Sequence, residues 1–160
     1  MKKLLAIVLS LCLLLVFAGC GDATTSSGEK EEAKVLSIDE VELTKADTIK
    51  AVAKEDLKVG FIFLHDANST YDKNFIDAAN AACEALGIGQ DQVIMKTGIP
   101  EGEECYTTAK ELVTAGCQVI FADSFGHEPY MIKAAKEFPK VQFCHATGTR
   151  GKIEGVGNYH

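Results

Sequence analysis

The feature that most constrains the fold of this chain is an unbroken apolar run, Val59 to Leu64, which reads Val-Gly-Phe-Ile-Phe-Leu. A strand with one solvent-exposed face alternates apolar and polar residues, whereas an unbroken apolar run is typical of a strand buried on both faces. Further short runs follow at 93–95, 119–122 and 141–144, all apolar except for Gln142. Strands of this kind occur in parallel sheets covered by helices, so the runs predict an α/β fold.

The segments between these runs have helical periodicity. The helix expected over 72–86 has an apolar face formed by Phe75, Ile76, Ala79, Cys83 and Leu86. The helix expected over 103–115 turns four residues inward, namely Tyr106, Ala109, Leu112 and Val113. Gly87 and Gly116 are expected as left-handed caps, and Pro129 can open a third helix. The alternation predicts a parallel sheet flanked by helices on both faces and joined by right-handed crossovers.

In a sheet of this type, ligands bind outside the carboxyl ends of the strands. The loops expected at that edge are 65–71, 97–103, 123–128 and 145–152. The last ten residues contain no apolar pattern that would close the fold with a helix or strand. We therefore expect residues 58–160 to form an incomplete lobe of a longer chain.

The N-terminus has the organisation of an export signal. Lys2 and Lys3 precede an apolar run from Leu4 to Phe17, and Ala18-Gly19-Cys20 follows. A basic start, a short apolar stretch and small residues before a cut predict a signal peptide over 1–19. Phe17 to Cys20 resembles a bacterial lipobox, in which Cys20 would carry the lipid. An ordinary signal peptide with an incidental cysteine, or a membrane anchor, is the alternative.

Two segments separate this signal from the predicted lobe. Residues 20–34 are rich in Gly, Ser, Thr, Glu and Lys, which predicts a flexible tether. Residues 35–57 have scattered apolar residues and are ambiguous. The predicted location is the extracytoplasmic face of the cell membrane, with the chain held there by lipid.

Composition excludes several classes of function. A net charge of -7 argues against nucleic acid as a partner, because phosphate binding needs clustered basic residues. No phosphate loop, nucleophile elbow or His-Glu-x-x-His motif occurs, so we expect no enzyme and no cofactor. Cys83, Cys105, Cys117 and Cys144 lack metal-site spacing, so no metal is expected. Buried thiols are favoured for them, and disulfides stay open.

Two of the loops carry polar and aromatic residues suited to a ligand. Asp66 follows the first buried strand, and its carboxylate could accept hydrogen bonds from a ligand. Phe75 lies one turn into the next helix and could present its ring. A turn or cap role for Asp66 and a core role for Phe75 are the alternatives. Asp123, Ser124 and Phe125 follow another strand, and together the two loops fit a heterocycle or a sugar.

The sequence resembles the N-terminal lobe of the basic membrane protein family, purine-nucleoside-binding lipoproteins of ABC importers. The family motif Asp-Lys-Ser-Phe-Asn-Gln corresponds to Asp72-Lys73-Asn74-Phe75-Ile76-Asp77, with Asn74 in place of Ser. Ser124-Phe125-Gly126 and His145-Ala146-Thr147-Gly148 resemble stretches of the purine-binding branch. The resemblance covers about 100 residues of the chain.

This resemblance implies a fold, a function and a site. The fold is the N-terminal lobe of a type I periplasmic binding protein. The function is solute binding for an ABC permease and ATPase, with a purine nucleoside or related heterocycle as ligand. The site residues are Asp66, Asn74, Phe75, Asp123, Ser124 and Phe125. A ligand-sensing receptor module with the same fold is the alternative, and an exported hydrolase is a third reading.

Overall fold

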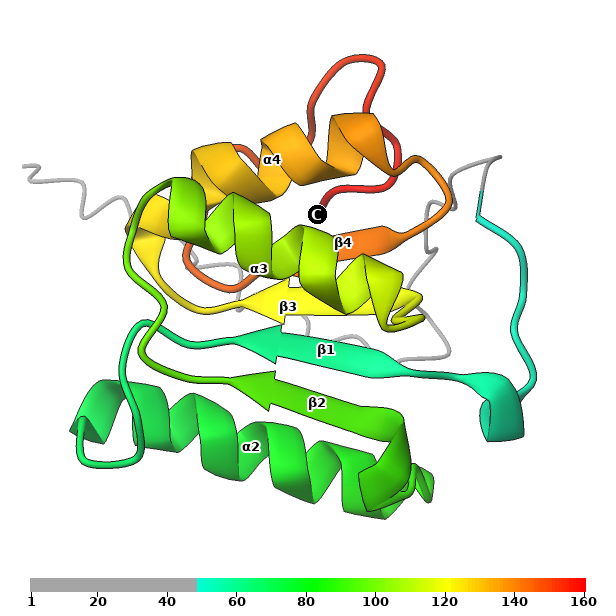
Figure 1. The fold of residues 1–160 in the computed structure, drawn as a ribbon, viewed down its shortest axis with the longest axis vertical. Helices are drawn as coiled ribbons and strands as arrows, with labels where there is room; N and C mark the ends of the chain where they lie inside the picture. The colour runs from blue at the N-terminus through cyan, green and yellow to red at the C-terminus, as the bar shows by residue number, and fades with distance from the viewer. Residues whose placement is uncertain (1–48) are drawn as a thin grey trace, which may run out of the picture. The chain divides into compact units, whose positions relative to one another are not determined.

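The computed structural model describes residues 49–160, which form a four-stranded parallel sheet with helices on both faces (Figure 1). The order of the strands is β2-β1-β3-β4, so the chain starts in the middle of the sheet and moves outward to each side. The strands are β1 (Val59–Ile62), β2 (Val93–Lys96), β3 (Val119–Ala122) and β4 (Gln142–His145). The predicted fold class, a parallel α/β sheet flanked by helices, is confirmed.

The helices also lie where the periodicity predicts them. They are α2 (Thr70–Leu86), α3 (Glu103–Thr114) and α4 (Glu128–Glu137). Gly87 ends α2 with φ of 67° and donates its amide to the last turn, as a left-handed C-cap does. Pro129 lies in the first turn of α4, where its missing N–H leaves no bond unmade. No helix among residues 49–160 is both long and apolar enough to cross a membrane.

Most of the predicted N-terminal segments lie outside the described residues: the signal peptide (1–19), Cys20, the tether (20–34) and most of 35–57. The end of the lead-in segment is described and contains a short 3-10 turn, η2 (Lys54–Asp56). The Gln92 amide donates to the carbonyls of Lys54 and Leu57 at 2.7 Å each. These bonds fix the approach to β1.

The two faces of the sheet are covered differently. Helices α3 and α4 pack over one face, and the larger core lies there, with Ile62, Ile120 and Phe143 from the strands and Leu112 from α3 all fully buried. Helix α2 covers part of the other face through Ala79 and Cys83. The four cysteines of the described residues are free thiols, three of them buried, as the sequence favours.

On the α2 face, part of the sheet over β3 and β4 is left open. Phe121 of β3 is 38% exposed there, and its ring stacks on Phe61 with centroids 5.2 Å apart. A cavity of about 540 Å³ lies between this surface and α2. Leu86 borders it together with Phe75, Ala79 and Cys83, as the predicted helical face implies, but the Leu86 side chain is 65% exposed.

Residues 151–160 contain no helix or strand, as expected, but the last of them lie beside β4. Tyr159 forms a parallel bridge with Phe143, and His160 exchanges backbone hydrogen bonds with Phe143 and His145. The Asn158 side chain donates to three carbonyls near the end of α4, those of Ala135, Phe138 and Val141. These contacts join residues that lie far apart in the sequence, so local periodicity does not reveal them.

Candidate functional site

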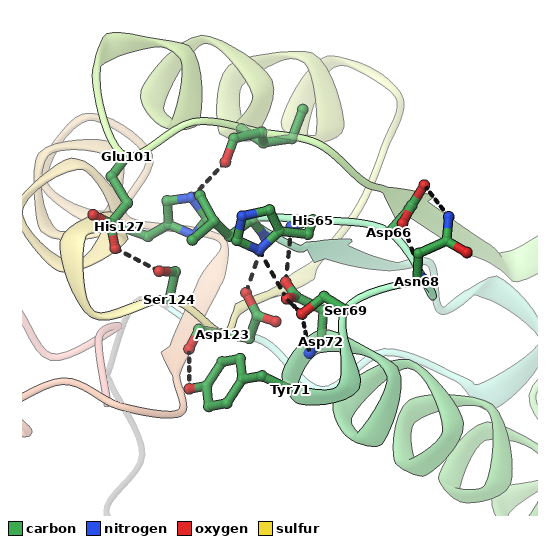
Figure 2. A network of polar contacts seen from close by, with 12 residues as sticks. His65, Asp66, Asn68, Ser69, Tyr71, Asp72, Glu101, Asp123, Ser124 and His127 are labelled. Atoms are coloured by element: carbon green, nitrogen blue, oxygen red, sulfur yellow. Dashed lines mark hydrogen bonds and ion pairs between the residues drawn. The ribbon is translucent and has the colours of Figure 1, made fainter.

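The polar side chains of the described residues gather at the carboxyl edge of the sheet, where the loops after the strands meet (Figure 2). They come from the loops that follow β1, β2 and β3, as Figure 2 shows, and His145 and Thr147 join them from the end of β4. This is the edge at which parallel α/β sheets bind ligands. The geometry of each group decides what the edge can recognise.

Asp72 anchors the loop after β1. Its carboxylate is fully buried and accepts hydrogen bonds from the His65 amide at 2.8 Å and the Ser69 hydroxyl at 2.5 Å. The His65 ring lies 3.0 Å from it. Burial alone would raise the pKa of Asp72, but these hydrogen bonds outweigh it and lower the pKa to about 2. Asp72 is therefore a structural anion that holds the loop.

Asp123 lies at the end of β3 and is 2% exposed. One carboxylate oxygen accepts the Leu64 amide at 3.3 Å, and the other has no donor among the described residues. Its backbone carbonyl accepts the hydroxyls of Tyr71 and Thr147. Burial and the neighbouring charge of Asp72 raise the pKa of Asp123 to about 6. A buried acceptor oxygen without a protein donor is suited to a ligand N–H or O–H.

The raised pKa of Asp123 predicts a pH dependence of stability. In the unfolded chain this carboxyl titrates near 4, so between pH 4 and 6 the folded protein binds more protons. Its contribution to the free energy of unfolding therefore falls as pH rises through this window. Asp123→Asn, which stays neutral, should gain on the order of 2 kcal/mol relative to the parent between pH 4 and 7.

Chemical denaturation of both proteins across this pH range measures the difference. Comparing the two proteins cancels the contributions of buried His127 and His145, whose lowered pKa values act in the opposite direction. Asp66→Asn is the matched control, because it replaces an exposed acid of the same edge with the same amide. If the difference in the free energy of unfolding between Asp123→Asn and the parent does not change with pH, the raised pKa of Asp123 is contradicted.

Glu101 connects the loop after β2 to the loop after β3. One of its carboxylate oxygens accepts both the Ser124 hydroxyl at 2.5 Å and the Gly126 amide at 2.8 Å. These two hydrogen bonds lower the pKa of Glu101, with the Ser124 bond as the larger cause. The His127 ring donates from Nε2 to the Ile99 carbonyl at 2.9 Å, which adds a third bond between the same two loops.

The loop after β4 closes the far side of the edge. His145 Nε2 lies 2.6 Å from the Ser124 carbonyl, and the Thr147 hydroxyl donates to the Asp123 carbonyl at 2.9 Å. A carbonyl oxygen can only accept, so Nε2 carries the hydrogen in His127 and His145. Burial lowers the pKa of both rings, which keeps them neutral.

The structure places the predicted site residues in different surroundings. Asp123 and Ser124 are buried at the edge, and Phe125 is 63% exposed beside them. Phe75 is half-buried, packs against the core under α2 and lies with its ring centroid 5.0 Å from that of Tyr71. It also lines the 540 Å³ cavity, as Asp123 does. Asp123 and Phe75 are therefore brought to one cavity.

Asp66 and Asn74 are both exposed. The carboxylate of Asp66 accepts from the amide and side chain of Asn68, at 2.9 and 3.1 Å, which makes it a turn residue as the alternative for it supposed. Ser69, rather than Asp66, caps α2. The assignment of ligand contacts to these residues stays a prediction.

Sequence reasoning missed four residues that shape this edge, namely Asp72, Glu101, His127 and Tyr71. Asp72 opens the helical pattern, and an acidic residue three positions after a serine is a cap signal that could have singled it out. Glu101 sits in an acidic stretch with Glu103 and Glu104, and nothing local distinguishes it from them.

Comparison with known proteins gives one clear relative. The chain is 38% identical over 101 residues to the curated purine-binding protein of Brucella abortus (strain 2308), covering 61% of this chain. It spans only 28% of that protein's length. No family model matches the chain. The match confirms the predicted resemblance to a purine-binding protein.

Solved structures give weaker likenesses. A transcriptional activator of the comK gene from Bacillus halodurans aligns with a TM-score of 0.49 and 20% identity over 57% of this chain and 30% of its own. An ABC transporter solute-binding protein from Conexibacter woesei aligns with a TM-score of 0.47 and 18% identity, over 55% of this chain and 28% of its own.

Proposed function

We propose that this chain is the ligand-binding part of an extracytoplasmic solute-binding protein that captures a purine base, a purine nucleoside or a related heterocycle for an ABC permease and ATPase. The observation that carries the proposal is the cavity of about 540 Å³ that Asp123 and Phe75 both line, where the Oδ2 atom of buried Asp123 has no donor among the described residues. The sequence identity to a purine-binding protein supports the same ligand class.

The chemistry of this edge suits a planar heterocycle better than a phosphate or a carboxylate. Among the described residues, Asp123 Oδ2 and the Nδ1 atoms of His127 and His145 are buried acceptors without a donor. Neutral heterocycles that carry N–H or amino groups can donate to such acceptors, and their rings can stack on an aromatic side chain. We therefore propose that this edge binds a ligand without a reaction.

Anchorage is the second part of the proposal. The small residues before Cys20 at the end of the apolar run support lipid attachment to that cysteine. Two or three acyl chains hold a protein stably on a bilayer, since each buried methylene contributes about 0.8 kcal/mol. The chain would then present its binding lobe outside the cell membrane, beside a permease.

Calorimetric titration of the full chain with a ligand panel tests the ligand class. Adenine, adenosine, guanosine and inosine should include at least one saturable binder, whereas glucose and ribose should give no heat of binding. Asp123→Ala should weaken the best purine about tenfold to a hundredfold, because a hydrogen bond to a charged group contributes about 1.5–3 kcal/mol. Saturable binding of a sugar and of no purine would contradict the proposal.

A further inference from the structure

Phe125 occupies an unusual position in the candidate site, because its ring is exposed while its backbone is held on both sides. The side chain is 63% exposed, but both neighbours in the chain, Ser124 and Gly126, hydrogen-bond to other loops. An exposed aromatic ring on a mobile loop loses freedom when a ligand stacks on it, which weakens binding. A ring whose backbone is already fixed avoids most of that loss.

One carboxylate oxygen of Glu101 accepts the hydrogen bonds on both sides of Phe125. Glu101 Oε1 accepts the Ser124 hydroxyl at 2.5 Å and the Gly126 amide at 2.8 Å, so the bonds flank Phe125. Glu101 follows β2, which does not neighbour β3 in the sheet, because β1 lies between them. These two hydrogen bonds, which we call the Glu101 clamp, therefore join two loops that follow strands not paired in the sheet.

Further contacts secure the same stretch. The Ser124 carbonyl accepts from His145, and the His127 ring donates to the Ile99 carbonyl near Glu101. Gly126 permits the close approach of the acid, because a Cβ at this position would lie 2.4 Å from the Glu101 carboxyl carbon. Any larger residue at 126 would therefore displace Glu101.

We propose that Glu101 is a positioning residue that fixes Phe125 as the aromatic platform of the ligand site and thereby sets affinity without touching the ligand. The inference rests on the proposed function for its ligand, a planar purine. It assigns to Glu101 an action through the backbone of residues 124–126. The two bonds go to a single oxygen, so a glutamine amide, which keeps a carbonyl oxygen in that place, can replace the acid.

A double-mutant cycle on the full chain tests this inference, with adenine and adenosine as the probes. Glu101→Ala should weaken binding about threefold to tenfold. Glu101→Gln should stay within about twofold of the parent, and Glu104→Ala, an exposed acid three positions on, should bind like the parent. In a Phe125→Leu background, Glu101→Ala should have almost no further effect, because the platform is already lost.

A ligand-free measurement keeps the inference separable from the proposed function. Backbone heteronuclear NOE values for Phe125 and Gly126 should fall in Glu101→Ala and recover in Glu101→Gln. If the parent binds neither adenine nor adenosine, the proposed ligand is wrong. If the NOE values of Phe125 and Gly126 are also unchanged in Glu101→Ala, then Glu101 does not fix the backbone of this loop. If the parent binds, equal affinity of Glu101→Ala, or an undiminished effect in the Phe125→Leu background, overturns the inference.

Discussion

Replacing Glu128 with alanine is expected to lower the free energy of unfolding by about 2–3 kcal/mol, because it removes a buried carboxylate that accepts several hydrogen bonds from the loop after β4. Glu128 is 3% exposed at the start of α4. Its carboxylate accepts the amides of Thr149 and Arg150 at 2.7 Å each, and the Arg150 guanidinium at 3.1 Å. The Tyr159 hydroxyl lies 3.4 Å from it.

This carboxylate holds the loop after β4, which also carries Thr147 to the candidate site. Burial alone would raise the pKa of Glu128, but the hydrogen bonds from Arg150 and Thr149 lower it. Because the folded pKa of Glu128 is lowered, its carboxylate stabilises the protein at pH values above the ordinary pKa of a glutamate. This stabilisation is lost as the pH falls from there through the lower folded pKa. The cost of Glu128→Ala should therefore shrink in acid.

Urea denaturation at pH 7 measures the effect. Glu137→Ala is the matched control, because Glu137 lies on the same helix with a side chain 42% exposed and pairs only at the surface with Lys110 and Tyr106. It should cost less than about 1 kcal/mol. Equal costs for the two variants would show that the Glu128 network contributes no more than a surface ion pair.

Replacing Cys20 with alanine is expected to abolish lipid attachment completely. The sulfur of Cys20 is the atom to which the lipid would be attached, and an alanine at this position has no nucleophilic atom in its side chain. Cells that express the full chain, labelled with radioactive palmitate, would show the outcome. The variant should be unlabelled and should leave the membrane fraction or be misprocessed.

Cys12 provides the control for this experiment, since it lies within the apolar run of the predicted signal peptide. Cys12→Ala should be labelled like the parent. Equal labelling of Cys20→Ala and the parent would rule out Cys20 as the lipid attachment site.

The regular elements of the fold could be predicted because their patterns are local. The unbroken run at 59–64 and the apolar stripes of the helices depend only on residues close in sequence, and Gly87 and Pro129 mark helix ends through their own backbone chemistry. The bridge between Tyr159 and Phe143 could not be predicted, since an isolated bridge has no period to read. Periodicity placed Leu86 on the same face of α2 as Phe75 and Cys83, but it does not show that this end of the face is left exposed.

The candidate site could be predicted at the level of loops but not of individual contacts. The rule for parallel sheets located the edge, and the loops with Asp123, Ser124 and Phe125 lie there. Asp66 and Asp72 are six residues apart in one polar stretch, and only the turn made by Asn68 and Ser69 leaves the first exposed and buries the second. Glu101 acts across 23 residues, a relation that no local pattern encodes.

An NMR titration with the tightest purine of the panel tests most directly whether the carboxyl edge of the sheet binds a purine. The amide signals of Leu64, Ser124 and Gly126 should shift in a saturable way, because these residues line or support the edge. Signals at the amino ends of the strands, such as those of Lys58 and Gln118, should stay in place. Shifts confined to the amino ends, or to the α2 surface around Leu86, would contradict the account.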